Sequence, residues 1–475
     1  MADDTTNPDI CVIGAGSGGL TVAAASAAFG VPVTLIERDR MGGDCLNYGC
    51  VPSKALIAAG KTAEMFRRAD RFGVRSTQPQ IDFAAVHAHV HGVIGKIAPN
   101  DSVERFEGLG VDVIKGDARF VDPDTVAVNG KRIKARRFVV ATGSRPFVPP
   151  IEGLKDTPHL TNETLFDLTR CPEHLLIIGG GPIGMEMAQA HRRLGARVTV
   201  VEGATPLGKD DPDLTAVVLK RLEAEGVVIE ANAKVVAVSG IEGAITLRVE
   251  RDGRRFEVRG SHLLVAVGRQ ANVDDLGLEA AGIAYDRSGI TVGRDLRTSN
   301  RRVYAVGDVA GGPQFTHVAG YHGGLVLRPL LFRLPIRTKH DEMPHVTYTD
   351  PELGQVGPTE AEARAAGHDV ATVSWSYEDN DRAQAEHETE GLVKFVVGKR
   401  GRIVGAGVAG AKAGEMTNLL ALAVSQGMKL SDLQGFVSPY PTLSEIAKRA
   451  ATSYYASYTS KPVVRSAIAF LRRFG

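Results

Sequence analysis

Two cysteines five residues apart are the most chemically informative feature of this 475-residue chain. Cys45 and Cys50 stand in a segment that reads Gly-Gly-Asp-Cys-Leu-Asn-Tyr-Gly-Cys-Val-Pro-Ser-Lys and ends at Lys54. On a regular α-helix their Cα atoms would lie roughly 8–9 Å apart, whereas a disulfide requires less than about 7 Å. We therefore expect a distorted turn, for which Gly49 and Pro52 are suitable. We also expect a redox-active dithiol, with a thiolate stabilised by the following helix and by Lys54.

Length, charge and cysteine content limit the possible classes of protein. The length predicts about three domains, and a net charge of +1 gives no electrostatic basis for binding nucleic acid. The first eight residues are polar and unlike a signal peptide, and no apolar run is long enough to span a bilayer. Cys11 and Cys171 lie in or beside apolar runs, so we expect both in the core. One tight pair among four cysteines favours a reducing, cytoplasmic location.

A dinucleotide-binding fingerprint precedes the cysteine pair. An apolar strand predicted at residues 10–13 leads into a G-x-G-x-x-G motif that runs from Gly14 to Gly19. A helix of small residues follows, and then a second strand, residues 33–36, ends at Glu37. The glycines permit a tight turn and a close approach of pyrophosphate to the helix N-terminus, and the acid is suited to bind a ribose.

The same pattern recurs in the middle of the chain. Apolar residues 175–178 lead into a motif from Gly179 to Gly184, and residues 197–201 end at Glu202. The first glycine and the terminal glutamate are 23 residues apart in both units. Two Rossmann units predict two dinucleotides, and the carboxylate of Glu202 favours the free ribose of NADH over the phosphate of NADPH. Nearby arginines that could soften this preference are Arg192, Arg193 and Arg197.

Each unit has a later companion strand that ends in glycine. Residues 138–142 end at Gly143, and residues 263–267 end at Gly268, so the chain can pass close to a cofactor at both points. A third glycine signal, Tyr-Ala-Val-Gly-Asp-Val around Gly307, resembles the flavin-ribityl motif of FAD-dependent reductases.

Through these motifs the whole chain resembles the class I pyridine-nucleotide disulfide oxidoreductases. This family includes dihydrolipoamide dehydrogenase, glutathione reductase and mercuric reductase. The resemblance implies an α/β fold with two Rossmann-type dinucleotide-binding domains and an α+β C-terminal dimerisation domain, assembled as a homodimer. The implied boundaries are an FAD domain (1–149), an NAD domain (150–270), a central domain that completes the FAD site (271–340) and an interface domain (341–475).

The resemblance also implies cofactors and residue roles. The cofactors are FAD and NAD(H), and electrons pass from nicotinamide through flavin to the disulfide. Cys50 is implied to be the flavin-facing, charge-transfer thiolate, and Cys45 the thiol that attacks substrate. Lys54 is implied to lie beside the flavin ring and to pair with Glu186. Other residues implied in cofactor binding are Gly14, Gly16, Ser17, Gly19, Glu37, Arg38, Gly43, Asp44, Ala118, Thr142, Gly143, Ser144, Gly179, Gly181, Ile183, Gly184, Glu202, Gly268, Arg269, Gly307, Asp308, Phe315 and Thr316, with no metal ligands.

The C-terminal segment departs from the family pattern at one position. Disulfide reductases carry a His-Pro stretch that ends in Glu, and its His acts as acid and base for the attacking thiol. Here Tyr440 replaces that His, while Glu445 is present. A phenol donates a proton but is a poor general base at pH 7, which argues against efficient dihydrolipoamide oxidation. Thr442 and Glu445 also match a capping box, so Glu445 is either catalytic or a helix cap. We expect His317 and His322 to be structural.

The mercuric reductase branch shares the tyrosine and the Gly-Gly-Asp-Cys opening. However, those enzymes deliver metal through a C-terminal cysteine pair, and this chain has no cysteine after Cys171. Mercury detoxification is therefore not expected. The same C-terminal region predicts strands and helices of an interface domain. Those strands are residues 346–349, 372–377 and 392–397, and the helices are residues 414–426 and 442–455.

Together these features predict an NADH-linked, dihydrolipoamide dehydrogenase-like flavoenzyme that cycles Cys45 and Cys50 on a small thiol or disulfide. One alternative is a diaphorase or mercuric-reductase-like enzyme that passes electrons to a quinone, oxygen or a metal. A second is a redox-sensing protein that binds FAD and NAD with little turnover. The tail, residues 460–474, combines apolar and basic residues. We expect it to pack within the dimer, with peripheral membrane contact as the alternative.

Overall fold

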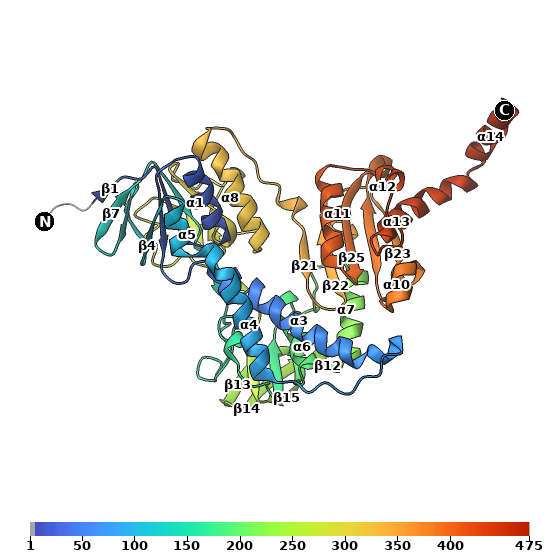
Figure 1. The fold of residues 1–475 in the computed structure, drawn as a ribbon, viewed down its shortest axis with the longest axis horizontal. Helices are drawn as coiled ribbons and strands as arrows, with labels where there is room; N and C mark the ends of the chain where they lie inside the picture. The colour runs from blue at the N-terminus through green and yellow to red at the C-terminus, as the bar shows by residue number, and fades with distance from the viewer. Residues whose placement is uncertain (1–4, 475) are drawn as a thin grey trace. The chain divides into compact units, whose positions relative to one another are not determined.

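A parallel five-stranded sheet carries the first glycine motif. Its strands in spatial order are β20 (Val303–Ala305), β8 (Arg137–Val140), β2 (Ile10–Ile13), β3 (Val33–Glu37) and β4 (Val111–Lys115). Every residue of β2 and β3 is buried, as expected for parallel strands covered on both faces. Helix α1 (Ser17–Ala28) packs on this sheet and beside α8 (Thr316–Leu331) (Figure 1). Because β20 comes from residues 271–340, that segment extends the first Rossmann sheet rather than standing apart from it.

The computed structural model describes residues 5–474, apart from the side chains of Ser457 and Tyr458. The chain divides into two compact units. Unit 1 contains residues up to 63, 79–203 and 232–340, and unit 2 contains residues 64–78, 204–231 and those from 341 onward. Within the described residues, no helix is long and apolar enough to cross a membrane.

Unit 1 also contains the second Rossmann sheet. In this sheet β10 (His174–Ile178) pairs in parallel with β11 (Arg197–Val201) on one side and with β16 (His262–Val265) on the other. Helix α6 (Pro182–Arg193) follows the second glycine motif and packs on β10 and β11. An antiparallel sheet of β13 (Lys234–Ile241), β14 (Ala244–Arg251) and β15 (Arg254–Gly260) lies between β11 and β16 in the chain.

The remaining elements of unit 1 support these two sheets. A second sheet of the first half has the order β1 (Thr5–Thr6), β7 (Lys131–Lys134), β6 (Thr125–Val128), β5 (Arg119–Asp122). The other elements are α2 (Gly43–Asn47), α3 (Cys50–Arg67, whose last residues group with unit 2), α4 (Phe83–Ile97), α5 (Val103–Gly108), β9 (Ser144–Pro146), β17 (Arg269–Ala271), β18 (Tyr285–Asp286) and β19 (Gly289–Ile290).

Unit 2 is built on an antiparallel sheet with the order β21 (His345–Thr347), β22 (Glu352–Val356), β25 (Ile403–Gly410), β24 (Leu392–Val397), β23 (Ala371–Ser376). Helix α11 (Ala413–Ser425) packs on β22 and β25, and α13 (Glu445–Ala456) packs on β23 and β24. The three strands and two helices predicted here are present, but β22 and β25 were missed. The other elements are α7 (Pro212–Ala224), β12 (Val227–Glu230), α9 (Glu360–Ala365), α10 (Asp381–Glu386), α12 (Leu430–Gly435) and α14 (Pro462–Leu471).

Candidate active site

The two cysteines lie on either side of a break between helices. Cys45 is in α2, which ends at Asn47, and Cys50 is the first residue of α3. The distorted turn expected from the five-residue spacing is therefore present. Gly49 makes it possible, because a Cβ at that position would lie 2.8 Å from the carboxylate of Asp44.

The surroundings of the pair favour a thiolate at Cys50. Both cysteines are free thiols, and the Sγ of Cys50 lies 3.2 Å from the hydroxyl oxygen of Thr316. A hydrogen bond from Cys45 is the largest influence on the pKa of Cys50. With the Thr316 hydroxyl and the charge of Lys54, it lowers that pKa to about 6 against the opposing effect of burial. The same hydrogen bond, and then burial, raises the pKa of Cys45. The pair thus keeps one proton, on Cys45, at neutral pH.

An ion pair links the cysteine helix to the second Rossmann unit. The Nζ of Lys54, one turn after Cys50, lies 2.9 Å from the Oε2 of Glu186 on α6. Glu186 is buried, whereas the side chain of Lys54 is 36% exposed. The predicted pairing of these two residues is therefore confirmed, and a cation is held close to the thiolate.

The two glycine motifs have the same geometry. In the first, the carboxylate of Glu37 accepts a hydrogen bond from the backbone N–H of Ala15 at 2.6 Å. In the second, Glu202 accepts one from Gly180, also at 2.6 Å. The leading glycine of each motif has a positive φ, 103° and 111°, and a Cβ there would overlap the carbonyl of the companion strand. Only glycine fits these positions, as the motif predicts.

Open space borders both motifs where a dinucleotide is expected. A Cβ added at Gly16, Gly143, Gly181 or Gly268 would meet no other atom within 4 Å. The backbone therefore leaves room for pyrophosphate next to the N-termini of α1 and α6, and the residues present fit the two cofactors.

Arg269 links three other predicted cofactor-binding residues in one polar cluster. Its guanidinium donates to the hydroxyl of Ser144 (2.7 Å) and lies 3.0 Å from the carboxylate of Asp44. The Ser144 hydroxyl in turn donates to Asp308 at 2.6 Å. Burial is the main reason that the pKa of Asp308 is raised. Sequence reasoning missed Asn162, whose amide donates to Asp44 (3.0 Å) and to the Tyr48 carbonyl.

Other candidates from the sequence have simpler surroundings. Ala118 is buried in the core of the first half, Arg38 is exposed, and Ile183 is 41% exposed at the start of α6. Phe315 precedes α8, and its ring stacks on His317 with the centroids 5.3 Å apart.

Buried His322 accepts a hydrogen bond from the Gly307 N–H, as expected for a structural histidine. Cys11 is in the core as predicted, but Cys171 is only partly buried.

Tyr440 and Glu445 belong to unit 2 and have partners there. Tyr440 is 68% exposed, and its hydroxyl donates to Asp381 at 2.9 Å, which raises the pKa of the phenol. The predicted capping box is wrong. The Thr442 hydroxyl donates to the Pro439 carbonyl, and the carboxylate of Glu445 pairs with Arg449 at 2.9 Å. The capping box would need the Glu445 carboxylate to accept a hydrogen bond from the backbone of Thr442, but Arg449, one turn into α13, pairs with that carboxylate instead.

Among the residues that the structure describes, no group of three His, Cys, Asp or Glu side chains could hold a metal ion.

The fold, the two glycine motifs and the cysteine pair define an oxidoreductase that binds two dinucleotides and uses a redox-active dithiol. Comparison with known proteins agrees. Residues 8–323 match the pyridine nucleotide-disulphide oxidoreductases, and residues 343–451 match the dimerisation domain of the same family. The chain belongs to this family. It is a flavin-dependent enzyme with FAD and NAD(H) as cofactors, and the dimerisation domain supports the expected homodimer.

Individual relatives differ in what they act on. The chain is 35% identical to a dihydrolipoyl dehydrogenase of Geobacillus stearothermophilus, over 95% of this chain and 97% of the relative. It is 34% identical to a mercuric reductase of Lysinibacillus sphaericus, over 94% and 83%. The HOCl-induced flavoprotein disulfide reductase RclA from Escherichia coli is similar in structure. It has a TM-score of 0.83 and 29% identity, over 94% of this chain and 99% of that one.

Proposed function

We propose that this enzyme catalyses NADH-linked dithiol–disulfide exchange on a small thiol or disulfide, in the manner of a dihydrolipoamide dehydrogenase. The observation that carries the proposal is the environment of Cys50. Cys45, Thr316 and Lys54 together stabilise its thiolate, beside a backbone built to hold two dinucleotides.

Cys45 and Cys50 carry the reaction through two stages, reduction of their own disulfide and then exchange with a substrate disulfide. When bound, FAD supplies the transfer of two electrons from NADH to the Cys45–Cys50 disulfide. The hydride that leaves NADH carries one proton with its two electrons, so the products are NAD⁺, the Cys45 thiol and the Cys50 thiolate. This is the protonation state that the site favours. Once deprotonated, Cys45 attacks a substrate disulfide to form a mixed disulfide and releases one substrate thiolate. Cys50 then attacks the sulfur of Cys45, which releases the second substrate thiolate and restores the disulfide.

The test is NADH oxidation by the purified holoenzyme with lipoamide and, separately, with a quinone. Wild type is compared with Cys50→Ser, and Cys171→Ser serves as a matched control because Cys171 lies outside the site. The proposal requires turnover with lipoamide that Cys50→Ser abolishes and Cys171→Ser retains. If Cys50→Ser keeps the lipoamide rate, dithiol exchange is not the route.

A second candidate is direct electron transfer to a quinone, oxygen or a metal. Two observations favour it. Tyr440 stands where disulfide reductases have their catalytic His, and its hydroxyl is occupied by Asp381. Relatives also include mercuric reductases, and one similar solved structure is a Cu(II) complex of RclA. Turnover restricted to quinone or Cu(II), and retained by Cys50→Ser, would identify this route. Negligible turnover with every acceptor would instead favour the redox-sensing alternative.

We further infer that the C-terminal tail packs against the second copy of the chain. No residue of α14 is buried within unit 2, and apolar Val463, Leu471 and Phe474 are all more than half exposed. The helix projects from the sheet of unit 2 (Figure 1). Truncation at Ser460 should weaken the dimer in analytical ultracentrifugation. It should leave sedimentation with anionic vesicles unchanged, and tighter vesicle binding by the full-length protein would favour the membrane alternative.

A further inference from the structure

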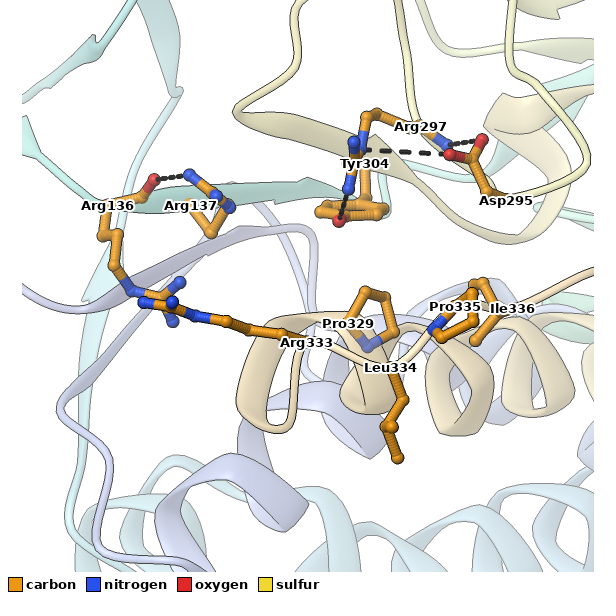
Figure 2. A pocket seen from close by; sticks show the side chains of 10 residues that line it. All are labelled: Arg136, Arg137, Asp295, Arg297, Tyr304, Pro329, Arg333, Leu334, Pro335 and Ile336. Atoms are coloured by element: carbon orange, nitrogen blue, oxygen red, sulfur yellow. Dashed lines mark hydrogen bonds and ion pairs between the residues drawn. The ribbon is translucent and has the colours of Figure 1, made fainter.

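A cavity of about 690 Å³ in unit 1 is lined by four arginines and lies outside the redox site. Figure 2 shows its walls, which come from the starts of β8 and β20, the loop before β20 and the end of α8. Its volume is within the range of small-ligand sites.

The cavity and the flavin motifs lie at opposite ends of the strands of this sheet. Arg137 is the first residue of β8, and the cofactor-binding Gly143 follows the other end of that strand. The six residue-to-residue steps between them span at most about 20 Å of extended chain. The NAD motif is on a different sheet, so neither dinucleotide accounts for the arginines.

The charges that line the cavity are not balanced. Arg136 makes two hydrogen bonds, 2.8 and 2.7 Å, to the carboxylate of Asp9. Arg297 lies 3.9 Å from the carboxylate of Asp295. In the portion of the chain that the structure describes, no carboxylate forms an ion pair with Arg137 or Arg333. Two positive charges therefore remain at the cavity without a counter-ion.

Two of the guanidiniums are held in place before any ligand binds. The guanidinium of Arg297 donates to the Tyr304 hydroxyl at 2.8 Å and lies 5.3 Å from the centre of that ring. Arg137 donates to the backbone carbonyl of Arg136 at 2.9 Å. Burial, and then the charge of Arg136, lower the pKa of Arg137, so an anion here would relieve an unfavourable environment.

The opposite wall is apolar. Pro329 on α8 and the turn that follows the helix supply it, with Leu334 47% exposed. In that turn the Leu334 N–H donates to the Arg328 carbonyl at 3.2 Å. In Figure 2, Arg333 extends from this turn toward the wall that Arg136 and Arg137 form. A ligand would therefore meet cations on one side and a hydrocarbon surface on the other.

We propose that this pocket binds a small phosphorylated organic molecule, with its phosphate at Arg137 and Arg333 and its apolar body against Pro329 and Leu334. Guanidinium forks match phosphate oxygens in geometry and charge. The proposal is independent of the redox reaction and of the substrate of Cys45.

The test uses the full-length FAD holoenzyme, saturated with NAD⁺ so that the nicotinamide-nucleotide site is filled. Binding of 1-naphthyl phosphate is measured by calorimetry for wild type, Arg137→Gln, Arg333→Gln and Arg301→Gln. The last variant is the matched control, since Arg301 is exposed, close in sequence to Tyr304 and outside the lining. Inorganic phosphate and vesicles that contain phosphatidic acid are tested in parallel.

We expect Arg137→Gln and Arg333→Gln each to weaken binding of 1-naphthyl phosphate about tenfold, with Arg301→Gln unchanged. Inorganic phosphate should bind more weakly than the naphthyl ester because it lacks the apolar body. Four outcomes would overturn the proposal: no binding to wild type, no effect of Arg333→Gln, equal weakening by Arg301→Gln, or binding to vesicles alone. Arg333 is exposed, so its variant remains informative if Arg137→Gln fails to fold.

Discussion

Removing the Thr316 hydroxyl should make Cys50 a weaker acid. In Thr316→Val the side chain keeps its size but loses the group that lies 3.2 Å from the Cys50 sulfur. A hydrogen bond to a charged group contributes about 1.5–3 kcal/mol, and one pKa unit corresponds to about 1.4 kcal/mol. Cys50 is exposed to solvent, although the protein atoms around its sulfur partly desolvate it, so the lower end of this range applies. The pKa should therefore rise by about one unit, from its value of about 6.

The assay is the pH dependence of alkylation of reduced enzyme by iodoacetamide, with Cys50 followed by mass spectrometry. Only the thiolate reacts, so the rate rises with pH, and its midpoint reports the pKa. At pH 6.5, relative to the alkaline plateau, Thr316→Val should react about threefold more slowly than wild type. Thr316→Ser retains the hydroxyl and should keep the wild-type midpoint. An unchanged midpoint in Thr316→Val, or an equal shift in Thr316→Ser, would refute the reasoning.

Three further predictions concern other parts of the molecule. Glu202→Gln should raise the KM for NADH about tenfold and reduce the preference of the enzyme for NADH over NADPH, because a charged hydrogen-bond acceptor for the ribose is lost. Steady-state kinetics with both nucleotides checks this. Tyr440→His should raise kcat/KM for lipoamide at least about tenfold with a new pH dependence near 6.5, whereas Tyr440→Phe should not, and equal rates would show that this position is not the base. Burial lowers the pKa of His191 to about 4, so the unfolded state binds more protons below pH 6.5 and stability falls as the pH drops from 6.5 toward 4. The loss should approach about 1.4 kcal/mol per pH unit, and His191→Leu should flatten it in urea unfolding at pH 5 and 7.

Some strands were predictable because their signals are local, and others were not. The buried runs before Gly14 and Gly179 are continuous apolar segments, which parallel strands require. Strand β25 has glycine at positions 405, 407 and 410, a composition that disfavours strands. It forms because its glycines allow close packing. A Cβ at Gly405 would overlap the carbonyl of Pro358, and one at Gly407 would overlap Leu214.

The same distinction applies to the site. The sequence by itself determined the two dinucleotide cradles and the cysteine pair, since the glycine spacings and the five-residue interval are properties of short segments. Through family resemblance it also predicted the partnership of Lys54 with Glu186. Only the tertiary structure decided that Thr316, 266 residues away, lies against Cys50, and that Arg269 gathers Asp44, Ser144 and Asp308. The arginine-lined cavity was also decided only by the tertiary structure. Its charges come from three separate segments, and their lack of counter-ions depends on distances that exist only after folding.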